Sequence, residues 1–180
     1  MNQFVGAVAI VLSLSAALIA IPMLAVGIHQ GRPQLLRSGA RYAWVILAGM
    51  IVATAAMQRA LITRDFDVLF VAEHGSSKTP PLFNVATMWS ALEGSILLWG
   101  LILAGYLMIV VRKFRHRLDD PLVAWAMIVM FVVTAFFLAL MMGPANPFKS
   151  FDAPVGFDGP GPNPLLQNHV LVAFHPPMLY

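Results

Sequence analysis

The stretch LVAWAMIVMFVVTAFFLALMM, residues 122–142, is an unbroken apolar run. About 20 apolar residues in a helix cross a hydrocarbon core roughly 30 Å thick. Asp120 is a suitable N-cap, and Pro121 is tolerated in a first helical turn. Gly143 and Pro144 follow the run and end it. The stretch therefore predicts a transmembrane helix with defined ends.

Three further apolar stretches have the length of a membrane span: residues 4–28, 42–62 and 94–111. The first lacks the basic start of a signal peptide and exceeds its usual apolar length, so it is interpreted as a retained span. We therefore expect an all-α polytopic membrane protein, with four transmembrane helices in a single membrane domain.

The composition agrees with a membrane environment. Hydrophobic residues make up 59% of the 180 positions and charged residues 11%, whereas soluble domains contain about 25% charged residues. The basic residues lie in short clusters between apolar runs, which indicates lipid-bilayer topology and not a nucleic-acid partner. There is no cysteine, which excludes disulfides, zinc–thiolate sites and CxxC redox chemistry.

Basic residues in the connections predict the orientation, because cytoplasmic loops are enriched in lysine and arginine. Two connections carry most of them, before residue 42 and after residue 111: Arg32, Arg37, Arg41, Arg112, Lys113, Arg115 and Arg117. These connections are expected in the cytoplasm. The N-terminus and the segments 63–92 and 143–175 are then expected on the outer face.

The two outer segments have distinct patterns. DFDVLFVA, residues 65–72, alternates in part and predicts a short strand or an interfacial ribbon. PPLFNVATMWSALEG, residues 80–94, predicts a short amphipathic helix along the interface. Residues 143–175 are rich in proline and glycine and are expected to be irregular.

The sharpest candidate for a functional residue is His175, in FHPPMLY at residues 174–180. Imidazole is a common axial ligand of haem iron. Pro176 disfavours the α conformation at His175, and Pro177 extends the constraint. A helix can begin after the prolines, so His175 is expected at the mouth of a fifth helix. The alternative is a stiff junction with a solvated histidine.

Other candidates have simpler alternatives. Glu93 stands at the entrance of the third span, where an ionisable group can handle protons or pair with Arg59 or Arg64. Its alternative is an interfacial carboxylate stabilised by a helix N-terminus. Trp89, just upstream, is a candidate cofactor contact or part of an aromatic belt. His169 is expected to be a loop residue.

Five blocks of sequence together resemble CcmF-type cytochrome c biogenesis proteins, which form the haem-handling superfamily with CcsA-type proteins. They are TRDFDVLFVAEHGSS (63–77), ATMWSALEGSILLW (86–99), NPF (146–148), NPLLQN (163–168) and FHPPMLY (174–180). The resemblance covers nearly the whole chain from Arg64, and the first two spans fit its hydropathy. Family members are several-fold longer, which implies that this chain corresponds to an N-terminal piece.

The resemblance implies a haem lyase of the bacterial inner membrane. Such proteins take haem from a haem chaperone, together with other maturation subunits, and join it to apocytochrome c on the outer face. The cofactor would be b-type haem in transit, with His175 as an axial iron ligand. Pro176, Pro177 and Tyr180 of the same motif, with Trp89 and Glu93, are the accompanying candidate haem-site residues. Two alternatives stay open: a non-catalytic scaffold of a cytochrome c assembly complex, and a proton- or quinone-coupled transport subunit that uses Glu93.

Overall fold

The structure is a computed structural model that describes residues 1–163, 171, 174 and 178. Its long helices are α1 (Asn2–His29), α2 (Pro33–Thr63), α5 (Leu92–Lys113) and α6 (Pro121–Met142), and two short helices are α3 (Leu69–His74) and α4 (Pro81–Thr87). The four long helices are long and apolar enough to cross a membrane. The prediction of an all-α protein with four spanning helices is therefore confirmed for the described residues. The predicted beginning of a fifth helix, at residues 176–180, lies outside them except for Met178.

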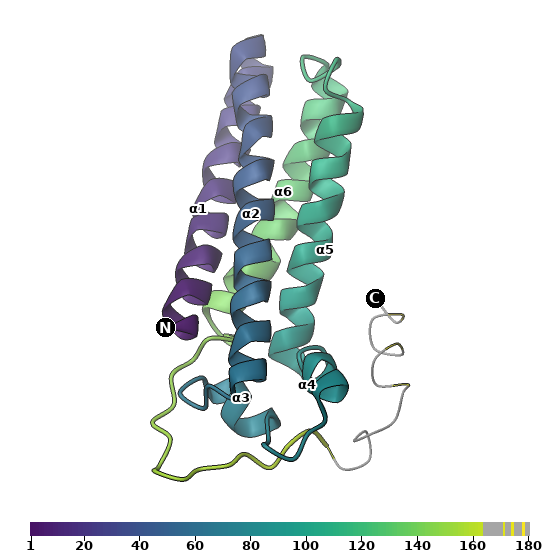
Figure 1. The fold of residues 1–180 in the computed structure, drawn as a ribbon. Helices are drawn as coiled ribbons and strands as arrows, with labels where there is room; N and C mark the ends of the chain where they lie inside the picture. The colour runs from purple at the N-terminus through teal and green to yellow at the C-terminus, as the bar shows by residue number, and fades with distance from the viewer. Residues whose placement is uncertain (164–170, 172–173, 175–177, 179–180) are drawn as a thin grey trace.

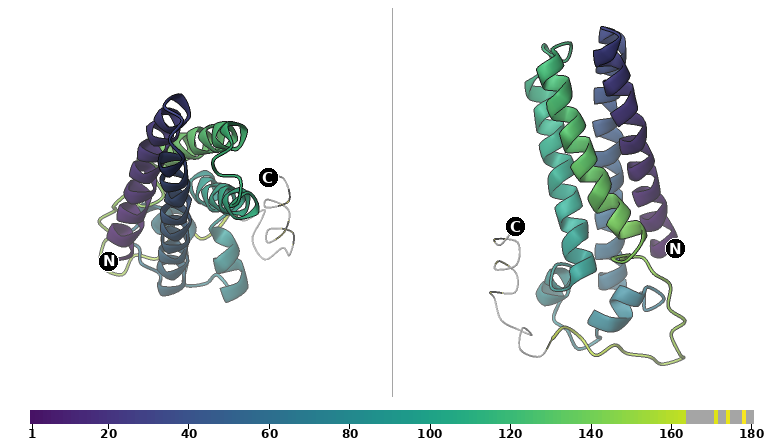
Figure 2. Two further views of the ribbon diagram at one scale, coloured as in Figure 1. Left: turned by 90° about the horizontal axis from the view of Figure 1, so that it is seen from above. Right: turned by 180° about the vertical axis from the view of Figure 1, so that it is seen from behind.

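The long helices form one bundle (Figure 1). Helix α1 packs against α2 and α6, and α5 packs against α2 and α6 as well. Helices α1 and α2 lie side by side as one pair, and α6 crosses from beside α5 at one end to beside α1 at the loop-bearing end (Figure 2). The helices α3 and α4 and the segment after α6 all lie at the same end of the bundle, which we call the loop end (Figure 1).

Small residues bring α1 and α2 close together. Ala16, Ala17 and Ala20 of α1 and Ala40 and Ala43 of α2 are almost fully buried. A Cβ on Gly39 would lie 2.8 Å from the Leu24 side chain, so Leu24 depends on that glycine for its space. In a membrane, where lipid is as apolar as the helix surface, such close packing is a main source of helix association.

Helix ends explain where the predicted spans were too short. Helix α2 begins at Pro33, although the apolar run begins only near residue 42. Its first turns carry arginines, and Arg37 donates to Asp119 in the loop before α6, with Nε 2.9 Å from Oδ1. Asp120 caps α6 as predicted: its carboxylate accepts from the Leu122 N–H at 2.9 Å.

The strand predicted over residues 65–72 is wrong for most of its length. Leu69–His74 is helical, and only Val68 makes a β-bridge, to Ser150. Phe70, Val71 and Ala72 are all buried, so the segment lacks the alternating exposed face on which the strand prediction depended. The short helix predicted over residues 80–94 is confirmed only in its first half: α4 ends at Thr87, and the chain turns over residues 88–91 before α5 begins at Leu92.

Candidate functional site

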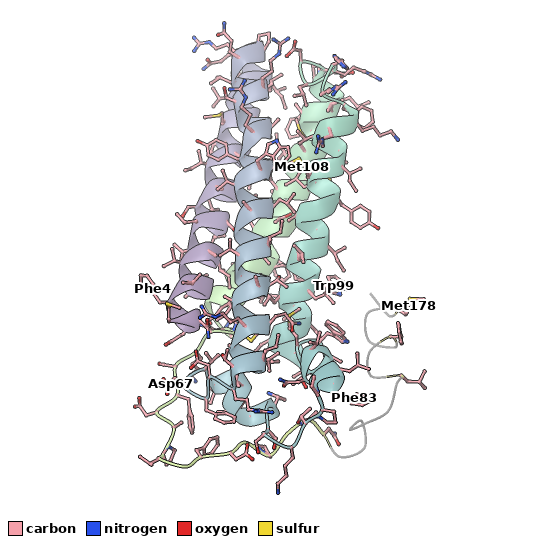
Figure 3. The ribbon with its side chains drawn as sticks, viewed as in Figure 1. Phe4, Asp67, Phe83, Trp99, Met108 and Met178 are labelled. Atoms are coloured by element: carbon pink, nitrogen blue, oxygen red, sulfur yellow. The ribbon has the colours of Figure 1, made fainter. Side chains whose placement is uncertain are left out.

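A cleft of about 450 Å³ opens at the loop end of the bundle. Its lining comes from α3, from the first turn of α5 and from the segment after α6: Leu69, Phe70, Glu73, Glu93, Gly143, Pro144, Asn146 and Lys149. It therefore combines two carboxylates, an ammonium group and an amide with an apolar wall. Figure 3 shows Asp67 and Phe83 at this same end, below the long helices.

Glu93 enters the cleft from the N-terminus of α5. It is the acidic residue of the first turn, where no side chain caps the helix. The Ser95 hydroxyl donates to the Trp89 carbonyl at 3.0 Å and so closes the turn that leads into α5. A carboxylate here gains about 0.3–1 kcal/mol from the helix dipole. The position of Glu93 therefore follows from how the chain enters the helix.

Glycine at position 94 makes this entry possible. A Cβ there would collide with the Met88 carbonyl oxygen and would lie 3.0 Å from the Phe70 ring. The chain before α5 consequently folds back directly over the first turn of the helix. Phe70 itself lines the cleft, so the same close approach sets one wall beside Glu93.

Main-chain pairing holds the start of α3 against the segment after α6. The Leu69 N–H donates to the Lys149 carbonyl at 2.8 Å, and the Phe151 N–H donates to the Asp67 carbonyl at 2.8 Å. These bonds place Lys149 beside the start of α3. Glu73 lies one turn further along α3 and also lines the cleft. Within the described residues, neither glutamate forms an ion pair with Lys149.

Two amide side chains join α4 to the end of α2. Gln58 Nε2 donates to the Val85 carbonyl at 3.2 Å, and Asn84 Nδ2 donates to the Leu61 carbonyl at 2.7 Å. Each helix thus supplies a donor to the backbone of the other. The amide oxygens of both side chains are buried without a hydrogen-bond partner in the described structure. Since buried amides are costly unless they are hydrogen-bonded, the two donated bonds fix where α4 sits.

A second link ties the loop before α4 to the segment after α6. Asp158 accepts hydrogen bonds from the Ser77 hydroxyl and, at 2.7 Å, from the Ser77 N–H. These two bonds hold the pKa of Asp158 below its ordinary value, and the bond from the Ser77 hydroxyl has the larger effect. The Gly161 N–H also donates to the Gly75 carbonyl at 3.1 Å.

The structure places only part of the predicted site. Glu93 lines the cleft, whereas Trp89 is half-buried, packs against the hydrophobic core and lies outside the cleft lining. Within the described part of the chain Glu93 makes no ion pair with Arg59 or Arg64, and Arg64 donates to the Ser77 carbonyl at 3.1 Å. Four predicted site residues of the FHPPMLY motif lie outside the described residues: His175, Pro176, Pro177 and Tyr180. His169 lies outside them as well.

No group of three His, Cys, Asp or Glu side chains among the described residues could hold a metal ion. His74, close to the cleft in sequence, stacks on Phe70 and has Nδ1 3.1 Å from the Phe70 carbonyl oxygen. The cleft offers carboxylate, ammonium and amide groups, which suit hydrogen bonding and proton exchange.

Sequence reasoning missed Glu73 and Asn146 of the cleft and the two amides that position α4. Glu73 would have been found by treating residues 69–74 as a helix, since Leu69 and Glu73 are then four residues apart on one face. The amides carried a weaker signal: Gln58 stands beside Arg59 near the end of an apolar stretch, and Asn84 is a single amide between apolar residues.

Comparison with known proteins gives consistent matches. No protein-family model matches the chain. It is 32% identical to the cytochrome c-type biogenesis protein CcmF of Escherichia coli over 86% of this chain and 24% of that protein. With CcmF of Pseudomonas aeruginosa the identity is 34% over 97% of this chain and 26% of that protein. The chain is of the CcmF type.

A solved structure supports the same family. The structure titled "Cytochrome c Heme Lyase CcmF" superimposes with a TM-score of 0.85 and 29% identity, over 100% of this chain and 28% of that one. The chain thus spans about a quarter of the length of the CcmF relatives it matches, corresponding to their N-terminal part. Its four spanning helices and its bacterial CcmF relatives identify a multi-pass bacterial membrane protein.

Proposed function

We propose that this chain takes part in cytochrome c maturation, as the portion of a haem lyase that presents haem to apocytochrome c on the outer face of the membrane. The observation that carries the proposal is the match to the CcmF haem lyase structure over the whole chain. The motif FHPPMLY supports it, because a histidine held by two prolines is a suitable axial ligand.

In haem attachment the main task of the protein is to position the reactants. In thioether formation the cysteine sulfur of apocytochrome c bonds to one vinyl carbon of haem, and the thiol hydrogen ends on the other vinyl carbon. The reaction needs reduced iron, a thiol and an ordered approach, so the protein's part is to hold and orient the cofactor. The absence of cysteine from this chain agrees with thiols supplied by the substrate.

The loop end offers surfaces that suit an amphipathic ring. Leu82 of α4 and Leu92 at the start of α5 are 64% and 66% exposed, and they supply apolar surface beside the chain entry to α5. Lys149 supplies a cation in the cleft that could pair with a propionate. In the proposed orientation this end is the outer face, where a haem chaperone and apocytochrome c can reach it.

The test uses the complete assembly that contains this chain. We expect His175→Ala to change the absorption spectrum of the bound haem and to abolish maturation of c-type cytochromes, measured by haem staining. His169→Ala is the matched control and should leave both unchanged. An unchanged spectrum and normal maturation in His175→Ala would remove the ligand assignment. A purified complex that lacks haem altogether would favour the scaffold function.

A proton-coupled role is the second candidate, because Glu93 lines a polar cleft together with Glu73 and Lys149. A carboxylate at the edge of a membrane helix, near a second carboxylate, can exchange protons with the outer solvent. This function would accompany haem reduction and would not replace haem attachment. Glu93→Gln tests it, because the substitution keeps the shape of the side chain and removes its proton chemistry.

A further inference from the structure

A shallow apolar groove runs along the outer side of the α1–α2 pair, with a volume of about 600 Å³. Its floor is made of small residues: Ala9, Ala48 and Gly49. Larger side chains form its walls, among them Phe4, Leu12 and Trp44, which are 72%, 57% and 50% exposed. Phe4 projects outward from α1 (Figure 3). The groove lies on spanning helices and faces away from the bundle core.

The groove is a consequence of close helix packing. A Cβ on Gly49 would collide with the Ser13 hydroxyl and would lie 2.9 Å from the Ala9 carbonyl oxygen. Glycine at this crossing therefore lets the two backbones approach closely. The result is a depression between rows of bulky residues.

One end of the groove carries positive charge. Arg41, Val45, Ala48 and Val52 follow one another at intervals of three or four residues on α2, so they share one helix face. Val45, Ala48 and Val52 line the groove, and Arg41, which is exposed, continues their row. From α5, the guanidinium carbon of Arg112 lies 5.4 Å from the centroid of the Trp44 ring. Two guanidinium groups thus stand near the same end.

These two arginines have no carboxylate partner in the described part of the chain. The ion pairs found there join Arg37 to Asp119 and Arg117 to Asp120. Stacking on Trp44 leaves the N–H groups of Arg112 free to donate in the ring plane. The charge at this end of the groove is therefore available to an anion that arrives from outside the described structure.

The length of the row fits one leaflet. The rise from Arg41 to Val52 is about 16 Å at 1.5 Å per residue, roughly half of a hydrocarbon core about 30 Å thick.

We propose that the groove binds an anionic phospholipid, with the phosphate at Arg41 and Arg112 and one acyl chain along Ala48 and Gly49. A zwitterionic lipid would bring no net negative charge to the two arginines. Their positive charge therefore favours an anionic headgroup.

Fluorescence quenching by brominated lipids tests the proposal. The protein is reconstituted in phosphatidylcholine vesicles that contain either brominated phosphatidylglycerol or brominated phosphatidylcholine at the same mole fraction. The fluorescence of Trp44 is obtained as the difference in fluorescence between the native protein and the Trp44→Phe variant. Trp125 of α6, which is 54% exposed and outside the groove, gives the reference contribution through Trp125→Phe.

We expect brominated phosphatidylglycerol to quench Trp44 fluorescence more strongly than brominated phosphatidylcholine does. The two lipids should quench Trp125 fluorescence equally. Since each basic residue at a membrane surface favours anionic lipid by roughly fivefold, Arg41→Gln with Arg112→Gln should remove the preference. Arg115→Gln, at the same end but outside the groove, should leave it. Filling the floor with Ala48→Phe should reduce quenching of Trp44, whereas Val129→Phe on the exposed face of α6 should not.

Two outcomes would overturn the proposal. Equal quenching of Trp44 by both brominated lipids would mean ordinary lipid contact without headgroup selection. Quenching of Trp44 by neither lipid would mean that another protein segment covers the groove. Both outcomes are independent of haem binding and cytochrome maturation, so they leave the proposed function untouched.

Discussion

The side chain of Asn84 in α4 donates a hydrogen bond of 2.7 Å to the main-chain carbonyl of Leu61 in α2. Helix α4 has only seven residues, and isolated helices of this length are unstable in water. Its position therefore depends on contacts such as this one. Because α4 leads directly into the turn that presents Glu93, the amide also acts on the cleft.

We expect Asn84→Ala to destabilise the protein by about 0.5–1.5 kcal/mol, the net value of a typical intramolecular hydrogen bond. The loss should be concentrated in α4, where backbone amide hydrogen exchange over Pro81–Thr87 should accelerate. Gln34→Ala removes an exposed amide at the other end of α2 and is the control. Unchanged exchange in α4 would show that packing alone holds this helix.

Gly94→Ala should destabilise the entry to α5. The added Cβ collides with the Met88 carbonyl oxygen, and overpacking of this kind costs about 1–3 kcal/mol. Gly105→Ala in the same helix is the matched control, because no atom lies within 4 Å of its Cβ position. That change should stabilise the helix by roughly 0.5–1 kcal/mol. Thermal unfolding in detergent measures both, and equal effects of the two substitutions would contradict the close approach at Gly94.

Acid should loosen the link between Asp158 and Ser77. The pKa of Asp158 is lowered in the folded protein, so its contribution to stability is present above the ordinary carboxyl pKa. It is lost as pH falls through the lowered pKa. We expect proteolysis within residues 151–163 to accelerate on acidification below the ordinary carboxyl range.

Asp158→Asn should give faster proteolysis already at neutral pH, together with a weaker dependence on pH. Asp152→Asn, in the same segment but without a recorded hydrogen bond, is the control. If Asp158→Asn kept the full acid dependence of the native protein, another group would be responsible for it.

Glu93→Gln should reduce cytochrome c maturation more than Glu73→Gln does. Glu93 is fixed by the first turn of α5 and is partly buried, whereas Glu73 of α3 is exposed. The substitution keeps the shape of the side chain and removes its proton chemistry. Maturation is measured by haem staining, and the redox state of bound haem by absorption. Normal values for both in Glu93→Gln would remove the proton-coupled role.

Much of the bundle could be predicted from sequence. The stretch at residues 122–142 and its cap at Asp120 were predicted correctly, because hydropathy and capping are local properties of the chain. The start of α2 was missed for the same reason. Residues 33–41 are helical but carry arginines, so the apolar run by which the span was recognised begins only at residue 42. The strand prediction at residues 65–72 failed because burial of consecutive residues there is decided by neighbours distant in sequence.

The candidate site was predictable only in part. Glu93 was found because an acid at the mouth of a spanning helix stands out against apolar neighbours. Glu73 and Lys149, which line the same cleft, were not grouped with Glu93, since they lie 20 and 56 positions from it along the sequence. No local pattern reports that the Leu69 N–H bonds to the Lys149 carbonyl.

The sequence by itself determined the membrane class, the number of spanning helices in the described chain and the family, because these depend on residue type and order along the chain. The tertiary structure decided what those helices bring together. It paired Ser77 with Asp158, gathered Glu73, Glu93 and Lys149 around one cleft, and left an apolar groove beside Gly49. The physical reason is that hydrogen bonds and close packing act over a few ångströms in space, whatever the separation of the residues in the chain.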